Sequence, residues 1–519
     1  MVLKLFHGFY KIELTKKRNF IMKSKTIFML SAVLALSLCA CKGNNNGGKT
    51  SEQQKQTPDV NPTMELKFDD LTEEDTACVP SYVKEYIDAM KEQETRITYP
   101  DRVDSLFCNM TWEQAAALGE KGDNATYSTS QKGGVDVCEM LSRSQSYENK
   151  PVELKWEKGD KDFSEAKVVF WTKVDKSDKR EAAVDASGEK AVAKLENLMI
   201  NTAYYYQVVN GEEASQMCDF VTGDYSRMIT MGKISNVRDI GGHTTSYGVT
   251  TNQGLIFRGG EITPKAFNEG GSHGANWTGK DAEAGQKVQE EVMKIGLELD
   301  LRTKSGSNNS TKSELNWDGE WQQENKNPNL QQVTELGNTD GKAQYVRCAI
   351  NSYDSFITDQ NRKSEAENAD RDVVGEIFNY FSNADKQHVY FHCWGGADRT
   401  GVSGFLLNAI CGVSYTDSII DFELTTLTNN KRCHMHNSSN AHFPKFLKIF
   451  TSEYEFERNG EKFQYTFDAE KTLRQNADNL LVAMGVKLET LEKIRGIMLP
   501  GYAEGKLTEN ERVNKGWQA

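Results

Sequence analysis

Apolar positions in the second half of the chain alternate between two spacings. Short apolar runs typical of buried strands occur at Leu297–Leu301 and Val389–His392. Each run follows a stretch in which apolar residues recur at helical spacing, beginning near Ala284 and Arg371 respectively. Strands that alternate with helices in this way predict an α/β domain over residues 226–519, with helices flanking a central sheet.

A different pattern occupies residues 126–225, where short runs of alternating apolar and polar residues are separated by turn-rich stretches. We expect strands at Val152–Trp156, Ala166–Val174, Lys190–Leu198 and Ala203–Gly211. Several short strands at this spacing predict an N-terminal all-β sandwich domain. The run Leu195–Val208 resembles a fibronectin type III or immunoglobulin-like module, which implies a role in spacing or in binding a partner that the sequence does not identify.

The remaining segments carry weaker patterns. Residues 64–125 have no assignment beyond a helix at Ser81–Glu94, where apolar residues recur at helical spacing after Pro80. The polar stretch Ser305–Asn329 is expected to be a surface insertion. From Phe443 to the end, the pattern is amphipathic and predicts helices.

The first residues have the layout of a secretory signal rather than of a folded element. Two lysines after Met22 precede the apolar run Ile27–Leu38, which is too short to span a bilayer comfortably. The sequence Leu-Cys-Ala-Cys that follows resembles a bacterial lipobox, which implies cleavage before Cys41 and lipidation of that residue, with Cys39 as the alternative. Residues 1–41 are therefore interpreted as an upstream start followed by a lipoprotein signal peptide.

Polar and small residues dominate the next segment, residues 42–63, and predict a flexible tether. Signal and tether together predict an exported bacterial lipoprotein. Its lipid would anchor it to a membrane, facing the periplasm or the outside of the cell.

Charge and cysteine usage narrow the function classes. The formal net charge of −13 argues against broad binding to nucleic acid or to an anionic membrane surface. The ten cysteines include no Cys-x-x-Cys pair, so a structural zinc site is not expected. A short cluster at Cys433–His436 resembles metal ligands but has no second ligand pair nearby. We expect neither a metal nor another cofactor.

The candidate chemistry lies in the connection His392–Gly401, whose sequence is His-Cys-Trp-Gly-Gly-Ala-Asp-Arg-Thr-Gly. A strand pattern ends at His392, and after Arg399 the apolar residues fall on one face of a helix. Residues 393–399 are therefore predicted to form a glycine-bearing loop at a helix N-terminus.

Such a loop favours an anion. Its backbone N–H groups lack partners within the helix and, together with the helix dipole, attract negative charge. Gly395 and Gly396 allow the unusual dihedrals of a cradle. A cradle of this kind lowers the pKa of Cys393 at its base, so the side chain is expected to be a thiolate near neutral pH. The planar Arg399 guanidinium can bind two phosphate oxygens at once.

The residues on either side of the loop are expected to support it. Thr400 offers a hydroxyl to the sulfur, and His392 is expected to orient the loop rather than to exchange protons.

This pattern resembles the phosphate loop of the cysteine-dependent phosphatases, the protein-tyrosine and dual-specificity superfamily. Three further segments, at Asn236–Gly242, Ile256–Glu261 and Leu299–Gly306, resemble successive signatures of bacterial secreted tyrosine phosphatases. Ile419–Leu427 looks like the helix that follows the loop in that family. The resemblance covers roughly residues 226–502 and implies hydrolysis of phosphomonoesters in two steps, through a phosphocysteine and without a metal.

The proton donor has two candidates. Asp398 matches the loop aspartate that serves as the acid in the myotubularin-like branch and in related bacterial enzymes. Asp300 ends a strand on a loop that can approach the same pocket, or it can instead hold Arg302. Arg238, Asp239 and Arg258 are expected to be architectural or to line the substrate rim.

Two loop residues bear on the substrate, which is expected to be a phosphotyrosine protein or peptide. Family members that handle phosphoinositides often carry lysine two places before the arginine, where this chain has Ala397. Trp394 can meet a phenyl ring or pack behind the loop.

Three other functions remain open. Within enzymes, the alternative is hydrolysis of phosphoinositides or inositol phosphates. Outside enzymes, the chain can be a lipoprotein that binds phosphorylated ligands without turnover. A rhodanese-like sulfur carrier shares the cysteine cradle but explains Arg399 and Thr400 less well.

Overall fold

The structure is a computed structural model. It describes residues 62–92, 149–232, 236–260, 287–302, 344–348, 373–393, 395–427, 449–458 and 461–513, with the single residues 234, 285, 350 and 446. The expected signal peptide with Cys41, almost all of the tether, Trp394, Ser305–Asn329 and Cys433–His436 lie outside these residues. No helix within the described ranges is long and apolar enough to cross a membrane.

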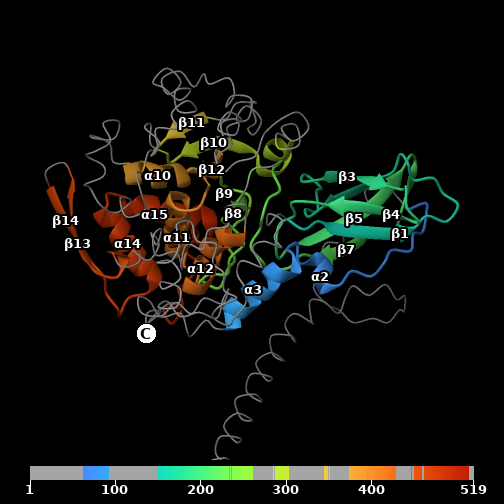
Figure 1. The fold of residues 1–519 in the computed structure, drawn as a ribbon. Coiled ribbons are helices and arrows are strands. Elements are labelled where there is room, and N and C mark those ends of the chain that lie inside the picture. Colours follow the sequence, from blue (N-terminus) through green and yellow to red (C-terminus); the bar gives the residue numbers. More distant parts are fainter. Residues whose placement is uncertain are drawn as a thin grey trace, which may run out of the picture.

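A five-stranded sheet forms the centre of the C-terminal half (Figure 1), in the order β11-β10-β12-β9-β8. The strands are β8 (Arg238–Asp239), β9 (Ile256–Gly259), β10 (Ile295–Asp300), β11 (Gln344–Arg347) and β12 (His388–His392). All neighbours are parallel except β8 and β9. The sheet agrees with the predicted α/β arrangement. Because β10 and β12 are parallel and Asp300 pairs with His392, the carboxyl ends of both strands reach the same edge.

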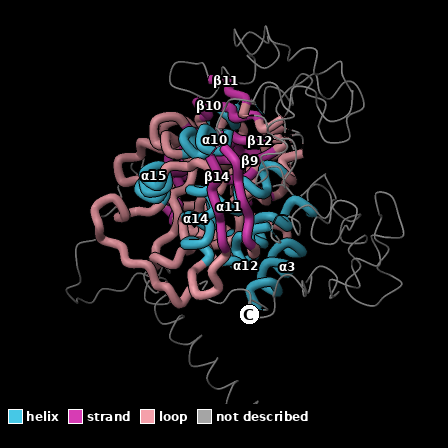
Figure 2. The backbone as a smooth tube through the Cα atoms, turned by 90° about the vertical axis from the view of Figure 1, so that its left-hand side faces the viewer, coloured by secondary structure: helices cyan, strands magenta, loops and turns pink. Residues whose placement is uncertain are grey.

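Helices surround this sheet (Figure 2). They are α10 (Val373–Phe381), α11 (Arg399–Ile410), α12 (Tyr415–Glu423), α14 (Leu473–Ala483) and α15 (Leu488–Met498), with a 3-10 turn at Leu424–Leu427 and a π-helical turn at Gln289–Met293. In α11, all residues from Thr400 to Ile410 are buried, and the helix packs beside both α12 and α14. The helix that follows the candidate loop is therefore a core helix.

The expectation of a helical pattern from Phe443 onward is wrong for one segment. Strands β13 (Glu453–Arg458) and β14 (Glu461–Thr466) form an antiparallel hairpin, in which Phe456 pairs with Phe463 and Tyr454 with Tyr465. Aromatic residues at every second position fit a strand better than a helix, and Asn-Gly, a common hairpin dipeptide, separates the two strands in the sequence. Helices α14 and α15 confirm the prediction over Leu473–Ala483 and Leu488–Met498.

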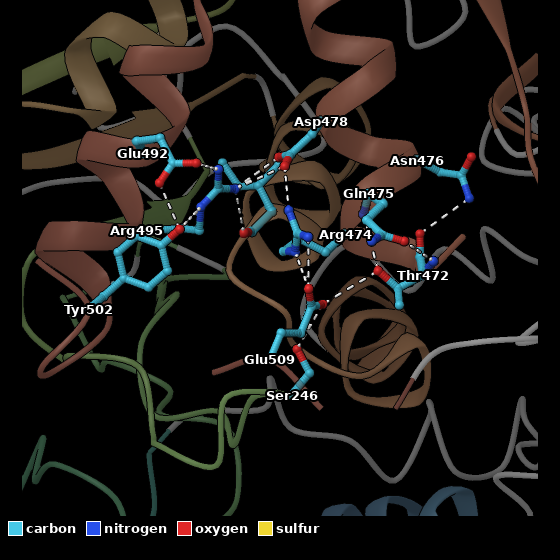
Figure 3. A network of polar contacts seen from close by, with 11 residues as sticks. Ser246, Thr472, Arg474, Gln475, Asn476, Asp478, Glu492, Arg495, Tyr502 and Glu509 are labelled. Carbon is cyan, nitrogen blue, oxygen red and sulfur yellow. Dashed lines mark hydrogen bonds and ion pairs between the residues drawn. The ribbon is translucent and has the colours of Figure 1, made fainter. Parts of the chain in front are cut away.

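A network of charged residues joins the C-terminal helices to α11 (Figure 3). The Arg495 guanidinium donates to the Asp478 carboxylate at 2.9 Å and to the carbonyl of Ile410, the last residue of α11, at 3.2 Å. Arg474 bonds both Asp478 and Glu509, which places the C-terminal segment against α14. A cation at the carboxyl end of a helix complements its dipole, so this network holds the far end of α11.

Seven antiparallel strands form a second, N-terminal sheet in the order β1-β4-β3-β2-β5-β6, with β7 paired to β5. They are β1 (Val152–Glu157), β2 (Lys167–Trp171), β3 (Arg180–Asp185), β4 (Lys190–Leu195), β5 (Ala203–Asn210), β6 (Glu213–Ala214) and β7 (Cys218–Val221). The four expected strands are present, β1 one residue longer than expected and β2, β4 and β5 shorter. The apolar pattern did not predict β3, because its side chains are only half-buried or exposed and give a weak apolar signal.

The first described residues contribute to both sheet units. Met64 bridges to Ser215 and Phe68 to Trp156, so this stretch lies along the N-terminal sheet. After the short helix α2 (Glu73–Thr76), helix α3 (Ser81–Glu92) packs instead against α12 of the phosphate-loop half. The helix expected at Ser81–Glu94 is therefore present and belongs with the C-terminal unit.

Candidate active site

The loop between β12 and α11 begins where the buried strand ends. Cys393 follows His392 directly and is only 2% exposed, and Arg399 is the first residue of α11. Gly396 has φ of +66°, and a Cβ built there would lie 2.2 Å from the carbonyl oxygen of Gly259 on β9. Only glycine fits that approach. The expected unusual dihedral is therefore present at Gly396.

The surroundings of Cys393 favour its thiolate. Burial opposes ionisation, and so does the Asp398 carboxylate, but the Arg399 guanidinium and the hydroxyl and amide of Thr400 outweigh them and lower the pKa of the thiol. The Thr400 hydroxyl is buried and has no other hydrogen-bond partner among the described residues. By contrast, burial raises the pKa of the remote thiols Cys78 and Cys411 to about 12. Cys393 is thus chemically set apart from these buried thiols.

Arg399 reaches across the carboxyl ends of two strands. One of its terminal nitrogens, Nη1, donates to the carbonyl oxygen of Ile350 at 3.0 Å and to that of Leu301 at 3.4 Å. Within the described part of the chain its guanidinium makes no ion pair, although it lies close enough to Cys393 to lower that pKa. The two carbonyl oxygens thus hold the Arg399 guanidinium in place near the Cys393 sulfur. A phosphate bound at Cys393 requires a guanidinium in that position.

The two candidate acids have different environments. Asp398 occupies the N-cap position of α11, but its side chain makes no capping hydrogen bond and is partly exposed beside Cys393. Asp300 is fully buried and forms a bidentate ion pair with Arg302, with both N···O distances 2.8 Å. The geometry brings Asp398 to the loop and gives Asp300 the task of holding Arg302.

A buried charge cluster supports the loop from beneath. Arg258 donates to the Gly396 carbonyl at 3.0 Å, and the Asn236 side chain donates to the Gly395 carbonyl at 2.9 Å. Asp421 on α12 pairs with Arg258 at 2.5 Å and with a second buried arginine, Arg238, at 2.7 Å. Burial disfavours the Asp421 carboxylate, but the two guanidiniums lower its pKa to about 2.

Arg238 and Arg258 were expected to be architectural or to line the substrate rim, and both are completely buried and contact the loop or its support, which favours the architectural role. Asp421 and Asn236 were not predicted, although each lies inside a quoted segment. For Asp421 the available signal was a carboxylate flanked by Ile420 and Phe422, since a carboxylate among apolar residues requires a buried cation. Asp239, also expected to be architectural, pairs with Arg227 at 2.6 Å.

A second buried acid, Glu298, was also missed. It lies in the middle of β10 and is completely buried, and its Oε1 is 2.8 Å from Nε2 of His392. The other ring nitrogen of His392, Nδ1, is 3.0 Å from the carbonyl oxygen of Cys393. A charged residue inside the apolar run Ile295–Asp300 was the available signal.

The structure therefore brings most of the predicted site together. The residues gathered at the carboxyl ends of β10 and β12 are His392, Cys393, Gly395, Gly396, Ala397, Asp398, Arg399, Thr400, Asp300 and Arg302. In the described ranges no group of three or more histidine, cysteine, aspartate or glutamate side chains is placed to hold a metal ion.

Comparison with known proteins agrees with this arrangement. A search of curated proteins finds no significant match to the chain. A family model described as the tyrosine phosphatase family matches residues 229–500, a range that begins just after the N-terminal sheet and includes the whole candidate loop. The match spans more than half of the 519 residues, and the chain belongs to the tyrosine phosphatase family.

Proposed function

We propose that the chain hydrolyses phosphomonoesters through a phosphocysteine formed on Cys393, with phosphotyrosine proteins or peptides as substrates. The observation that carries the proposal is the lowered pKa of a nearly buried thiol at a helix N-terminus, caused by Arg399 and Thr400. A thiolate is the nucleophilic form of cysteine. It can attack a phosphoryl group only where the substrate binds next to the sulfur.

In the first step the Cys393 thiolate attacks phosphorus, and the bond from phosphorus to the ester oxygen breaks. Asp398 donates its proton to the departing oxygen. The loop N–H groups and Arg399 stabilise the negative charge on the remaining phosphoryl oxygens. The product of this step is a phosphocysteine and a free alcohol or phenol.

In the second step a water molecule attacks the phosphocysteine. Asp398, now a carboxylate, accepts the proton of the water, and the sulfur leaves as a thiolate. Inorganic phosphate is released, and both side chains return to their starting protonation states. His392 and Thr400 position the thiolate in both steps.

Two features favour phosphotyrosine within this reaction class. Cys393 is 2% exposed, so the phosphate must be presented on a long group such as a tyrosine side chain. Ala397 is buried and supplies no cation, whereas a polyphosphorylated inositol ring would call for more positive charge near the loop.

The cellular setting follows from the N-terminal sequence. Residues 1–41 provide the upstream start and the lipoprotein signal peptide, and Cys41 carries the lipid that anchors the exported chain to a membrane. Residues 42–63 form the tether. The N-terminal sheet is an all-β sandwich of the fibronectin type III or immunoglobulin-like kind, with a structural or binding role.

The test is phosphate release by residues 50–519, with a Cys393→Ser variant in parallel. The substrates are a phosphotyrosine peptide, a phosphoserine peptide, a phosphoinositide and inositol hexakisphosphate. The proposal predicts Cys393-dependent release that is fastest from phosphotyrosine. Faster release from the inositol compounds would indicate a phosphoinositide or inositol phosphate phosphatase. No release from any substrate under reducing conditions would support a protein that binds phosphorylated ligands without turnover.

A further inference from the structure

Glu298 is an acid in an unusual position. It lies on the interior strand β10, is completely buried, and has one oxygen, Oε2, without a hydrogen-bond partner among the described residues. A buried carboxylate with an unsatisfied oxygen is costly to a fold, and an apolar residue of similar size would fill the same strand position at less cost. Its polar contact with a side chain in the described residues is the 2.8 Å contact between its Oε1 and Nε2 of His392.

The geometry of His392 fixes where its protons lie. Nδ1 is 3.0 Å from the Cys393 carbonyl oxygen, which can only accept, so Nδ1 must carry a proton and donate it. Nε2 then faces Glu298. If neither Nε2 nor the carboxyl carried a proton, a lone pair would face a carboxylate inside the protein core. A second proton therefore lies between Nε2 and Glu298.

We propose that Glu298 is a positioning residue, which keeps this second proton on His392 and so both orients the Cys393 backbone and favours the Cys393 thiolate. The proposal deepens the proposed function and rests on it for its catalytic meaning. The imidazolium belongs to the residue adjacent to Cys393, whereas the carboxylate belongs to a neighbouring strand. Because His392 directly precedes Cys393 in the chain, a positive charge on its ring acts on the thiol from the neighbouring residue, and a nearby positive charge favours a thiolate.

Other charged groups face the same region and must be considered with it. Besides burial, Asp300 at the end of β10 raises the pKa of His392, and Arg302, two residues further on, lowers it. Burial opposes the imidazolium, but Asp300 and Glu298 together raise the pKa of His392 above its ordinary value. Burial likewise raises the pKa of Glu298. Both shifts agree with a pair that retains its proton.

The other charged groups that act on the thiol are Arg399 at the start of α11, Asp398 at its N-cap, and Arg258 on β9. No hydrogen bond joins Arg399 or Arg258 to His392 within the described structure. Their effect on the pKa of the Cys393 thiol should therefore persist when Glu298 is substituted. The substitution should thus report only the contribution of the His392–Glu298 pair to that pKa.

The test measures the rate at which iodoacetamide alkylates Cys393 as a function of pH, followed on the Cys393 peptide by mass spectrometry. Glu298→Gln has nearly the same shape and can still hydrogen-bond a neutral His392, but it cannot hold the second proton. The midpoint of the alkylation profile should shift upward by about one pH unit, the low end of the effect of a neighbouring opposite charge. Asp478→Asn, which also removes a mostly buried carboxylate but in the network behind α11, should leave the midpoint unchanged.

A second pair of variants tests whether Glu298 acts through His392. In a His392→Asn background, where the asparagine amide can still donate to the Cys393 carbonyl, Glu298→Gln should add no further shift. An unchanged midpoint in Glu298→Gln alone, or an equal shift in both backgrounds, would overturn the proposal.

A measurement on the unaltered protein covers the case in which the variants do not fold. The His392 ring signals, assigned by their absence in a His392→Asn sample or by selective labelling, should show both nitrogens protonated at pH 7.5. A neutral ring at that pH would overturn the proposal. Neither readout requires turnover, so a failure of the phosphatase assay leaves the test of Glu298 intact, and the reverse also holds.

Discussion

At the scale of single residues, the site depends on a contrast among acids. Asp398 is partly exposed near the Cys393 sulfur. Asp300 is buried in an ion pair with Arg302, and Glu298 is buried in contact with His392. Three carboxyls near one loop therefore take three roles, because each has a different partner and a different access to solvent. The chain positions of Asp398 and Asp300 identified both as candidates, but only their contacts separate them.

Asp398→Asn tests the assignment of the proton donor. The amide cannot supply a proton, so turnover of a phosphate ester with a poor leaving group should fall by about a hundred- to ten-thousand-fold. Turnover of an ester with a good leaving group should fall much less, since that oxygen leaves without protonation. Steady-state kinetics on phosphotyrosine and p-nitrophenyl phosphate provide the comparison, and equal losses on both would count against Asp398.

At the scale of elements, the loop is held between β12, β9 and α12. Local apolar spacing predicted the strand before the loop and the helix after it, and therefore placed Cys393 between them. The support beneath it was not predictable in the same way. Arg258 and Asp421 are 163 positions apart, and only the fold brings them to 2.5 Å.

Asp421→Asn tests this support. The substitution leaves Arg238 and Arg258 buried without a carboxylate, which should cost about 3–5 kcal/mol of unfolding free energy. Because the pKa of Asp421 is depressed to about 2 in the folded protein, its contribution is present above the unfolded value near 4 and is lost as pH falls toward 2. Thermal unfolding at several pH values should therefore show a smaller gap between the two proteins at low pH. A gap that stays constant or widens on acidification would contradict this role.

At the scale of the whole molecule, the two sheet units are joined by buried polar contacts. The Asn197 side chain exchanges two hydrogen bonds with the backbone of Thr230, at 2.7 and 3.1 Å. The Gln253 amide exchanges two with the backbone of Ile200, both 2.9 Å. Thr230 lies a few residues before Asn236 and Arg238, which contact the loop or its support. The N-terminal sheet therefore helps to hold the segment that supports the loop. The sequence predicted both units but not their contact, because single polar residues in turns give no signal of a distant partner.

Asn197→Gly tests whether the two units unfold together. Asn197 has φ of +54°, so glycine keeps its backbone conformation while removing both hydrogen bonds to Thr230. Loss of about 1–3 kcal/mol is expected, since the half-buried backbone N–H and carbonyl of Thr230 are left without these partners. The matched control is Asn201→Gly, at φ of +47° on an exposed residue, which should change little. If both variants lost a similar amount of melting temperature, the loss in Asn197→Gly could not be attributed to its hydrogen bonds with Thr230.

The central claim is that Cys393 becomes phosphorylated during turnover. The most direct measurement is a rapid acid quench of the enzyme while it hydrolyses a phosphotyrosine peptide, followed by mass spectrometry of the peptide that contains Cys393. The proposed mechanism predicts a phosphoryl group on that cysteine within the first turnovers, and none in Cys393→Ser, which should also release no phosphate. Sustained phosphate release by Cys393→Ser would contradict the mechanism.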